Sequence, residues 1–218
     1  MSTYILMRIL ESAPERYDKG ISLLTLGRLN EVYNRLASHI KKGQKVLDIG
    51  CGTGAMTLRA AQKGAAVKGI DINSQMLEMA QKRAREKNLT QNIELCEMGI
   101  AELCNEESQS YDIVMSTLCF SELSENEVTY TLKEVNRVLR PGGLLLIADE
   151  VRSNHAAKRI LNWLLKAPLV IMTYLITQTT THAIDNLPEK IKKAGLRVMS
   201  IKLNKIGNFI EVVANKPI

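Results

Sequence analysis

Apolar and polar positions along the chain form two kinds of pattern, which predict strands separated by helices. From Lys45 onward, short apolar runs alternate with longer stretches whose apolar residues lie three and four positions apart. The predicted strands cover residues 45–49, 66–71, 92–97, 111–116 and 144–149, and the predicted helices cover residues 55–62, 74–87 and 125–139. Parallel strands need helical crossovers between them, so the pattern predicts an α/β fold with a parallel sheet. The Pro141-Gly142-Gly143 segment is expected to interrupt the chain before the fifth strand.

The end of the chain has a different pattern. A predicted helix at residues 188–194 precedes two strand-like runs at residues 196–203 and 208–214, and only residues 204–207 separate these runs. A connection that short joins antiparallel strands. We therefore expect a doubly wound, seven-stranded sheet that is mostly parallel and has an antiparallel last strand.

Two segments lie outside this alternation and define the expected domain organisation. Residues 1–44 are expected to form an N-terminal helical lid, residues 45–150 the core, residues 151–187 a helical insertion, and residues 188–218 the helix and hairpin that complete the core. The centre of the insertion, residues 160–177, is apolar but includes Lys166 and Pro168. A membrane-spanning helix needs ~20 mostly uncharged residues, so we expect no such helix. We expect a helix pair over the active-site mouth, and the alternative is a contact with a membrane surface or a second copy.

Composition and charge narrow the function classes. The chain is 45% hydrophobic and 24% charged, as in an ordinary globular protein, and its net charge of +6 is scattered, so we expect no nucleic-acid partner. No two cysteines form a C-x-x-C pair, so neither a metal site nor a disulfide framework is expected. The first ten residues lack the pattern of a secretory signal, which favours the cytoplasm.

The strongest chemical signal is a glycine-rich turn directly after the first predicted strand. Gly50, Gly52 and Gly54 alternate with other residues, and Cys51 lies within the turn, where its backbone is the part that matters. Glycines let a backbone turn sharply and approach a ligand closely, and the following helix offers free N–H groups. The turn also satisfies the loose dinucleotide fingerprint. Asp48 distinguishes a dinucleotide from a ligand that contains an amino-acid group. A carboxylate at this position repels a pyrophosphate but suits the ammonium group of an amino acid.

A second acidic residue, Asp71, ends the second predicted strand. A carboxylate at this position can accept hydrogen bonds from ribose hydroxyls. The alternative is that Asp71 caps the next helix, but Ser74 is expected to be that cap. We therefore expect an adenosine-containing ligand.

The acidic-x-Gly-x-Gly-x-Gly form of residues 48–54 resembles the first motif of class I S-adenosylmethionine-dependent methyltransferases. Residues 111–116 resemble the fourth strand of that family, and residues 139–144 resemble its turn into the fifth strand. The resemblance implies S-adenosylmethionine as cofactor, S-adenosylhomocysteine as product, and a Rossmann-like fold. It also implies further cofactor contacts at Ile72, Ile100, Ala101 and Ser116. Ile100 departs from the family, because many relatives have an Asp there that contacts the adenine amino group.

The N-terminal segment resembles a narrower group. Glu15-Arg16-Tyr17-Asp18 and residues 23–27 are similar to the leading helices of ubiquinone/menaquinone-biosynthesis C-methyltransferases, in which the Tyr-Asp element covers the cofactor. This implies a cofactor contact for Tyr17, and the alternative is that Tyr17 packs as an ordinary helix aromatic. Residues 10–20 also resemble a smaller set of methyltransferases associated with corrinoid proteins.

The chemistry implied by the resemblance is an in-line displacement by the acceptor on an activated methyl group. The protein then contributes mainly by orienting the two partners and excluding water, and a general base is needed only for some nucleophiles. We assign no catalytic residue; the candidates for a base are Asp149, Glu150 and His155, followed by Glu122 and His182. Neither Cys51 nor Cys119 has a convincing histidine partner, so a thiolate nucleophile is not expected.

The sequence leaves several functions open. The leading hypothesis is methyl transfer to a small, apolar acceptor, because residues 163–174 of the insertion are rich in large apolar side chains. The alternatives are methyl transfer to a macromolecule, either a corrinoid protein or RNA, and a non-catalytic module that retains the cofactor site. A dinucleotide oxidoreductase is a poorer candidate, because of Asp48.

Overall fold

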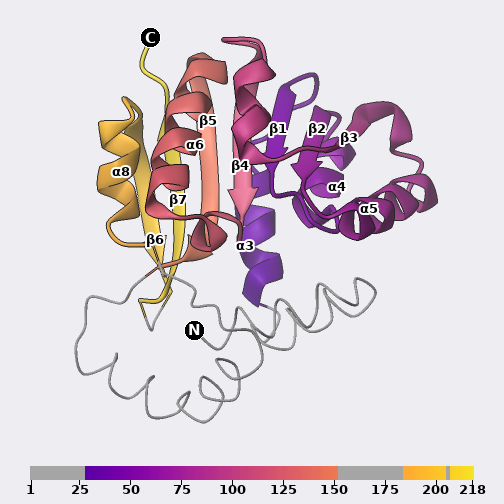
Figure 1. Cartoon of the computed structure of the whole chain (residues 1–218). Helices are drawn as coiled ribbons and strands as arrows, with labels where there is room; N and C mark the ends of the chain where they lie inside the picture. The colour runs from indigo at the N-terminus through magenta and orange to yellow at the C-terminus, as the bar shows by residue number, and fades with distance from the viewer. Residues whose placement is uncertain (1–27, 152–183, 205–206) are drawn as a thin grey trace.

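The computed structural model describes residues 28–151, 184–204 and 207–218, and in these ranges it shows one seven-stranded sheet with helices on both faces (Figure 1). The strands are β1 (Lys45–Ile49), β2 (Ala66–Asp71), β3 (Ile93–Glu97), β4 (Tyr111–Thr117), β5 (Leu139–Glu150), β6 (Arg197–Leu203) and β7 (Phe209–Asn215). Their order in the sheet is β3-β2-β1-β4-β5-β7-β6. The order reverses between β1 and β4, and ligands of doubly wound sheets bind at such a reversal.

The helices alternate with the strands as the sequence predicts. The α-helices are α3 (Arg28–Ala37), α4 (Ala55–Gln62), α5 (Ser74–Glu86), α6 (Glu125–Val138) and α8 (Leu187–Lys193), and short 3-10 helices are η1 (Thr90–Asn92), η2 (Ile100–Asn105) and η3 (Phe120–Glu122). The first five strands pair in parallel, and β7 lies antiparallel between β5 and β6. The seven-stranded fold with an antiparallel last strand is therefore confirmed.

Apolar side chains point alternately to the two faces of the sheet along each strand, which explains why helices cover both faces. In β1, Val46 faces a core formed with α3 and α4, whereas Leu47 and Ile49 face a second core formed with α6 and α8. Along β5, residues 145–149 are all buried, as predicted for a strand covered on both faces. This double cover places the functional groups at the exposed carboxyl ends of the strands.

Two local expectations are wrong. β5 begins at Leu139, because Leu139 pairs with Tyr111 and because backbone hydrogen bonds join Gly142 and Gly143 to Lys216. The proline segment is therefore a register shift within the strand, and the chain is not broken before it. The second error concerns α5, whose N-cap is Asn73. The Asn73 side chain accepts hydrogen bonds from the backbone N–H groups of residues 75 and 76, so Ser74 is the first helical residue.

The helix α3 connects the N-terminal part of the chain to the sheet. Arg35 on α3 donates two hydrogen bonds, of 2.6 and 2.9 Å, to the carboxylate of Glu211 on β7. Arg59 on α4 donates to Asn30 and lies over the ring of Tyr33, 5.1 Å from its centre. Residues 1–27 of the expected lid (1–44) and residues 152–183 of the expected insertion (151–187) lie outside the described residues. Among the helices that are described, none is long and apolar enough to cross a membrane.

Candidate functional site

The glycine-rich turn lies where β1 ends and α4 begins, at the reversal of the strand order. The N–H groups of Gly50 and Cys51 donate to the carbonyl oxygen of Ile70, at 2.9 and 3.0 Å, and Gly54 N–H donates to Cys51 O at 2.9 Å. The three glycines have φ values of 68°, 52° and 80°, in the left-handed region that side chains other than glycine rarely adopt. The alternating glycines therefore allow a compact turn at the end of a buried strand.

Each glycine of this turn has a different neighbour. A Cβ added to Gly50 would lie 2.5 Å from both Cβ and Sγ of Cys119, and one added to Gly54 would lie 3.0 Å from Cβ of Ala80. A Cβ added to Gly52 would have no atom within 4 Å. Gly50 and Gly54 thus allow close packing within the protein, whereas Gly52 borders open space that a ligand can enter.

Asp48 lies at the base of the turn and is almost completely buried. Its Oδ2 accepts a hydrogen bond of 2.6 Å from the Thr57 hydroxyl, while its Oδ1 is buried and has no hydrogen-bond partner among the described residues. The pKa of Asp48 is raised to about 7, chiefly by burial and to a smaller extent by the nearby charge of Asp71, whereas the hydrogen bonds from Thr57 lower it. A buried acceptor oxygen without a donor fits a cationic ligand group, because such a group would satisfy the oxygen and favour the charged carboxylate.

Asp71 connects the end of β2 to the glycine-rich turn. Its Oδ2 accepts a hydrogen bond of 2.8 Å from Gly52 N–H, and its Oδ1 accepts one of 2.9 Å from Asn73 N–H. A carboxylate oxygen can accept more than one hydrogen bond, so both oxygens retain capacity for ribose hydroxyls. The side chain of the next residue, Ile72, is 74% exposed.

The predicted adenine contacts lie beside Ile72. A Cβ added to Gly99 would lie 3.5 Å from Cγ2 of Ile72, so the segment before η2 approaches the end of β2. Ile100 is half-buried and Ala101 is exposed, and the Ala101 carbonyl oxygen accepts a hydrogen bond from the Tyr130 hydroxyl at 3.0 Å. The structure thus places the exposed side chain of Ile72 beside the backbone of Gly99, the residue before Ile100.

The remaining predicted contacts differ in position. Ser116 is fully buried, and its hydroxyl donates to Ile49 O at 2.8 Å, so it connects the ends of β4 and β1. Cys51 is buried, and its backbone forms part of the turn. Tyr17, His155 and His182 lie outside the described residues.

Both carboxylate oxygens of the candidate base Asp149 are occupied by backbone donors. Asp149 is fully buried, and its carboxylate accepts hydrogen bonds from the backbone N–H groups of Phe120 and Glu150 at 2.8 and 2.7 Å. Burial raises the pKa of the thiols of Cys51 and Cys119 well above the usual range, so neither is a thiolate at neutral pH. This agrees with the expectation that no cysteine acts as a nucleophile.

Sequence reasoning missed two contributors to the site. Thr57 lies in the first turn of α4 and holds Asp48, and Cys119 packs against Gly50. A hydroxyl residue three positions after the last glycine is a signal for the first contact, because the first helical turn faces the end of the preceding strand. No local pattern indicates the second contact, which joins residues 69 positions apart.

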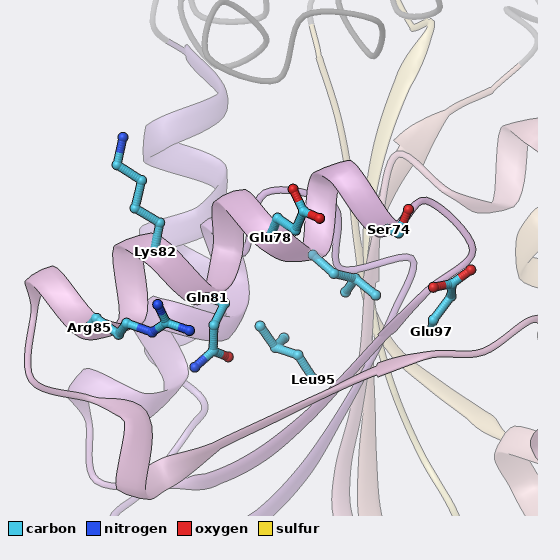
Figure 2. Close-up of a pocket in the computed structure, with 8 residues that line it drawn as sticks. Ser74, Glu78, Gln81, Lys82, Arg85, Leu95 and Glu97 are labelled. Carbon is cyan, nitrogen blue, oxygen red and sulfur yellow. The ribbon is translucent and has the colours of Figure 1, made fainter.

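An open groove lies between α5 and the edge strand β3 (Figure 2). Its volume is about 420 Å³, and its lining includes Glu78, Lys82, Arg85 and Leu95. None of the predicted cofactor residues lines it, so it is distinct from the glycine-rich turn. Within the described ranges, no three metal-binding side chains lie close enough together to hold a metal ion.

Comparison with known proteins identifies the family. The family described as "Methyltransferase domain" matches residues 46–143. A Synechocystis protein named uncharacterized methyltransferase sll0829 is 30% identical over 183 residues, which cover 82% of this chain and 80% of the relative. The chain belongs to the class I S-adenosylmethionine-dependent methyltransferases. This confirms the resemblance drawn from residues 48–54 and identifies S-adenosylmethionine as the cofactor of the family.

Two further relatives also have names that describe them as methyltransferases. The demethylmenaquinone methyltransferase of Tropheryma whipplei is 31% identical over 140 residues, covering 62% of this chain and 54% of the relative. Methyltransferase GfsG of Streptomyces halstedii is 31% identical over 172 residues, covering 78% of this chain and 58% of the relative. The chain therefore spans little more than half the length of these two relatives.

Solved structures agree on the fold. An S-adenosylmethionine-dependent methyltransferase from Methanosarcina mazei superposes with a TM-score of 0.65 at 23% identity, covering 83% of this chain and 96% of that chain. The methyltransferase thus has the Rossmann-like fold of its family, and the turn at residues 50–54 lies at the point where the strand order reverses.

Proposed function

We propose that this methyltransferase transfers a methyl group from S-adenosylmethionine to a small, apolar acceptor. The observation that carries the cofactor's placement is the buried Asp48 Oδ1, which has no partner among the described residues and lies at the base of a turn that opens at Gly52. The cofactor's ammonium group suits this oxygen, its ribose suits Asp71, and its adenine suits the apolar side chains of Ile72 and Ile100.

The chemistry supplied by the cofactor is an activated methyl group on a sulfonium. The protein itself must bind the cofactor and the acceptor, orient them toward each other and exclude water. Asp48, Asp71 and the backbone of the turn would hold the two halves of the cofactor. The expected lid and insertion are proposed to cover the acceptor.

Two observations support an apolar acceptor. The demethylmenaquinone methyltransferase of Tropheryma whipplei is similar over 62% of this chain, and its name specifies a quinone-type acceptor. Residues 160–177 are also rich in apolar side chains, as suits a cover for a hydrophobic acceptor. We further propose that the protein works in the cytoplasm, because all four of its cysteines are free.

Calorimetric titration of the purified protein with S-adenosylhomocysteine tests the cofactor site, with NADH titrated alongside. We expect selective binding of S-adenosylhomocysteine. The Gly52→Ala variant is the matched control, because its added Cβ occupies the open space without touching the protein. Binding of NADH instead, or equal binding by the variant, would contradict the proposed placement.

Incubation with S-adenosylmethionine that carries an isotopically labelled methyl group tests the acceptor class. We expect label in short-chain quinols or other uncharged apolar acceptors, detected by mass spectrometry, and none in RNA or in a corrinoid protein. Label confined to a macromolecule would overturn the proposal of a small acceptor while leaving the cofactor site intact.

A further inference from the structure

The segment after β4, residues 118–122, contacts both neighbouring strand ends. We call it the post-β4 loop. On one side, the Cys119 side chain lies against Gly50 so closely that a Cβ on this glycine would be 2.5 Å from it. On the other side, Leu118 N–H donates to Ala148 O at 2.9 Å. The loop therefore bridges the cofactor-binding turn and the end of β5.

The carboxylate of Asp149 organises this loop from the end of β5. Its Oδ2 accepts hydrogen bonds from Phe120 N–H at 2.8 Å and from Ser121 N–H at 3.4 Å, and its Oδ1 accepts one from Glu150 N–H at 2.7 Å. Asp149 is fully buried, so its charge is stabilised by these backbone donors instead of by water. A carboxylate is well suited to this position, because each of its oxygens accepts a hydrogen bond from a backbone N–H group.

The backbone of the loop is strained at the residue before Cys119. Leu118 has a φ of 57°, in the left-handed region that a bulky side chain rarely adopts. Such strain persists only where surrounding contacts enforce it, and strained residues cluster at functional sites. The contacts that enforce it here are the Ala148 carbonyl on one side of Leu118 and the Asp149 carboxylate two residues after it.

We propose that Asp149 is a positioning residue, which fixes the post-β4 loop against the glycine-rich turn and so shapes the part of the site that receives the amino-acid half of the cofactor. This proposal rests on the cofactor placement proposed above. It accounts for a buried carboxylate that contacts neither Asp48 nor Asp71 and whose oxygens are both occupied by backbone donors. Asp149 acts through the loop, so it is not a catalytic base.

The charge of Asp149 depends on the groups that donate hydrogen bonds to its carboxylate. Its pKa is raised to about 6, chiefly by burial and to a smaller extent by the neighbouring carboxylate of Glu150, whereas the hydrogen bonds from Ser121, Glu150 and Phe120 lower it. The donors therefore favour the charged form of Asp149, against its burial. In an Asp149→Asn variant, one oxygen becomes an NH₂ group, which would face the N–H of either Phe120 or Glu150 and lose that hydrogen bond.

The test measures two properties separately. One is the accessibility of Cys119 in the loop, and the other is the affinity for ligands with and without the amino-acid half of the cofactor. Alkylation of the native protein, followed by mass spectrometry of its peptides, gives the labelling rate of Cys119, and the exposed Cys104 serves as the internal reference. Calorimetry gives the affinity for S-adenosylhomocysteine and for 5′-methylthioadenosine, which lacks the amino-acid half. Asp112→Asn is the matched control, because Asp112 lies at the other end of β4 and pairs with Arg140.

We expect Asp149→Asn to raise the Cys119 labelling rate about tenfold relative to Cys104, because the loop opens locally more often. The affinity for S-adenosylhomocysteine should fall about tenfold, while the affinity for 5′-methylthioadenosine changes by less than about twofold. Asp112→Asn should change none of these values. A general loss of structure would weaken both ligands alike, and so would overturn the positioning role.

Equal Cys119 labelling in Asp149→Asn and in the unmodified protein would also overturn the proposal. If Asp149→Asn does not fold, Ser121→Ala keeps the backbone donors but removes the side-chain hydroxyl, whose hydrogen bond lowers the pKa of Asp149. This variant should raise Cys119 labelling about threefold, and no increase would overturn the proposal. Failure of the unmodified protein to bind S-adenosylhomocysteine is a different result. It would refute the proposed function, whereas the labelling comparison still decides whether Asp149 holds the loop.

Discussion

The carboxylate of Asp71 accepts a hydrogen bond from the backbone N–H of Gly52, at 2.8 Å between Gly52 N and Asp71 Oδ2. This contact joins the end of β2 to the middle of the glycine-rich turn, across two strands that pair in parallel. The residue proposed to bind ribose therefore also fixes the turn that binds the rest of the cofactor. Its two roles must be separated by experiment, because loss of either weakens cofactor binding.

An Asp71→Ala variant is expected to bind S-adenosylhomocysteine 10–100 times more weakly, a change of about 1.4–2.8 kcal/mol. Repeating the titration with an analogue that lacks both ribose hydroxyls separates the two roles. If Asp71 binds ribose, the analogue already lacks that contact, so the substitution should weaken its binding far less. Calorimetry measures all four affinities of this cycle. Equal weakening for both ligands would show that Asp71 acts only through Gly52.

The glycines of the turn should respond differently to the same substitution. Gly52→Ala places its Cβ in open space, so the free energy of unfolding should fall by only about 1 kcal/mol from the left-handed backbone, while cofactor binding is lost. Gly54→Ala places its Cβ 3.0 Å from Ala80 and should destabilise the fold more. Thermal unfolding and calorimetry of both variants check this. A Gly52→Ala variant that keeps its affinity would place the cofactor elsewhere.

Local patterns were sufficient to predict the sheet. Apolar runs such as residues 144–149 and the short connection before β7 correctly gave the seven strands, and the spacing of Asp48, Gly50, Gly52 and Gly54 correctly indicated the family. Errors arose where a local preference competed with pairing. A proline usually ends a strand. At Pro141, however, the pairing of Leu139 with Tyr111 and of Gly142 with Lys216 extends β5 past the proline.

The site was only partly predictable for a related reason. The alternating glycines mark the turn because their backbone conformation requires them, but the contacts that complete the site join residues distant in sequence. Cys119 packs against Gly50, and Asp149 accepts from Phe120, through the order of the strands in the sheet. A single sequence contains no signal for such a pair, whereas the parallel register of β1, β4 and β5 brings their ends together.

Cofactor affinity should depend on pH through Asp48. Its pKa is about 7 in the cofactor-free protein, so at pH 6 most molecules carry a neutral carboxyl group. A cationic ammonium favours the charged form, so binding at pH 6 should release a proton, and the affinity for S-adenosylhomocysteine should rise about tenfold from pH 6 to pH 8. Calorimetry in buffers of different ionisation enthalpy measures both quantities.

Two variants check that Asp48 causes this dependence. Asp48→Asn should bind more weakly and show a flat profile between pH 6 and pH 8, because its amide does not titrate. Thr57→Val removes the hydroxyl that donates to Asp48 Oδ2 at 2.6 Å, so it should raise the pKa of Asp48 and move the profile to higher pH. An unchanged profile in Asp48→Asn would assign the titration to another group.

Asp48 should also reduce the stability of the cofactor-free protein. Burial raises its pKa from 3.8 to about 7, so between these values the native state binds more protons than the unfolded state. The free energy of unfolding therefore decreases as the pH rises from 4 to 7, and stays reduced above pH 7. We expect Asp48→Asn to stabilise the cofactor-free protein at pH 8 by an amount on the order of a few kcal/mol, and to have little effect near pH 4.

Asp149 also has a raised pKa, but it is present in both proteins, so it cancels in their difference. Urea unfolding of both proteins across this pH range measures the effect, after bound cofactor has been removed. If Asp48→Asn were less stable at pH 8, the buried carboxylate would have to be held by the fold itself, and the unpartnered Oδ1 would no longer indicate a ligand.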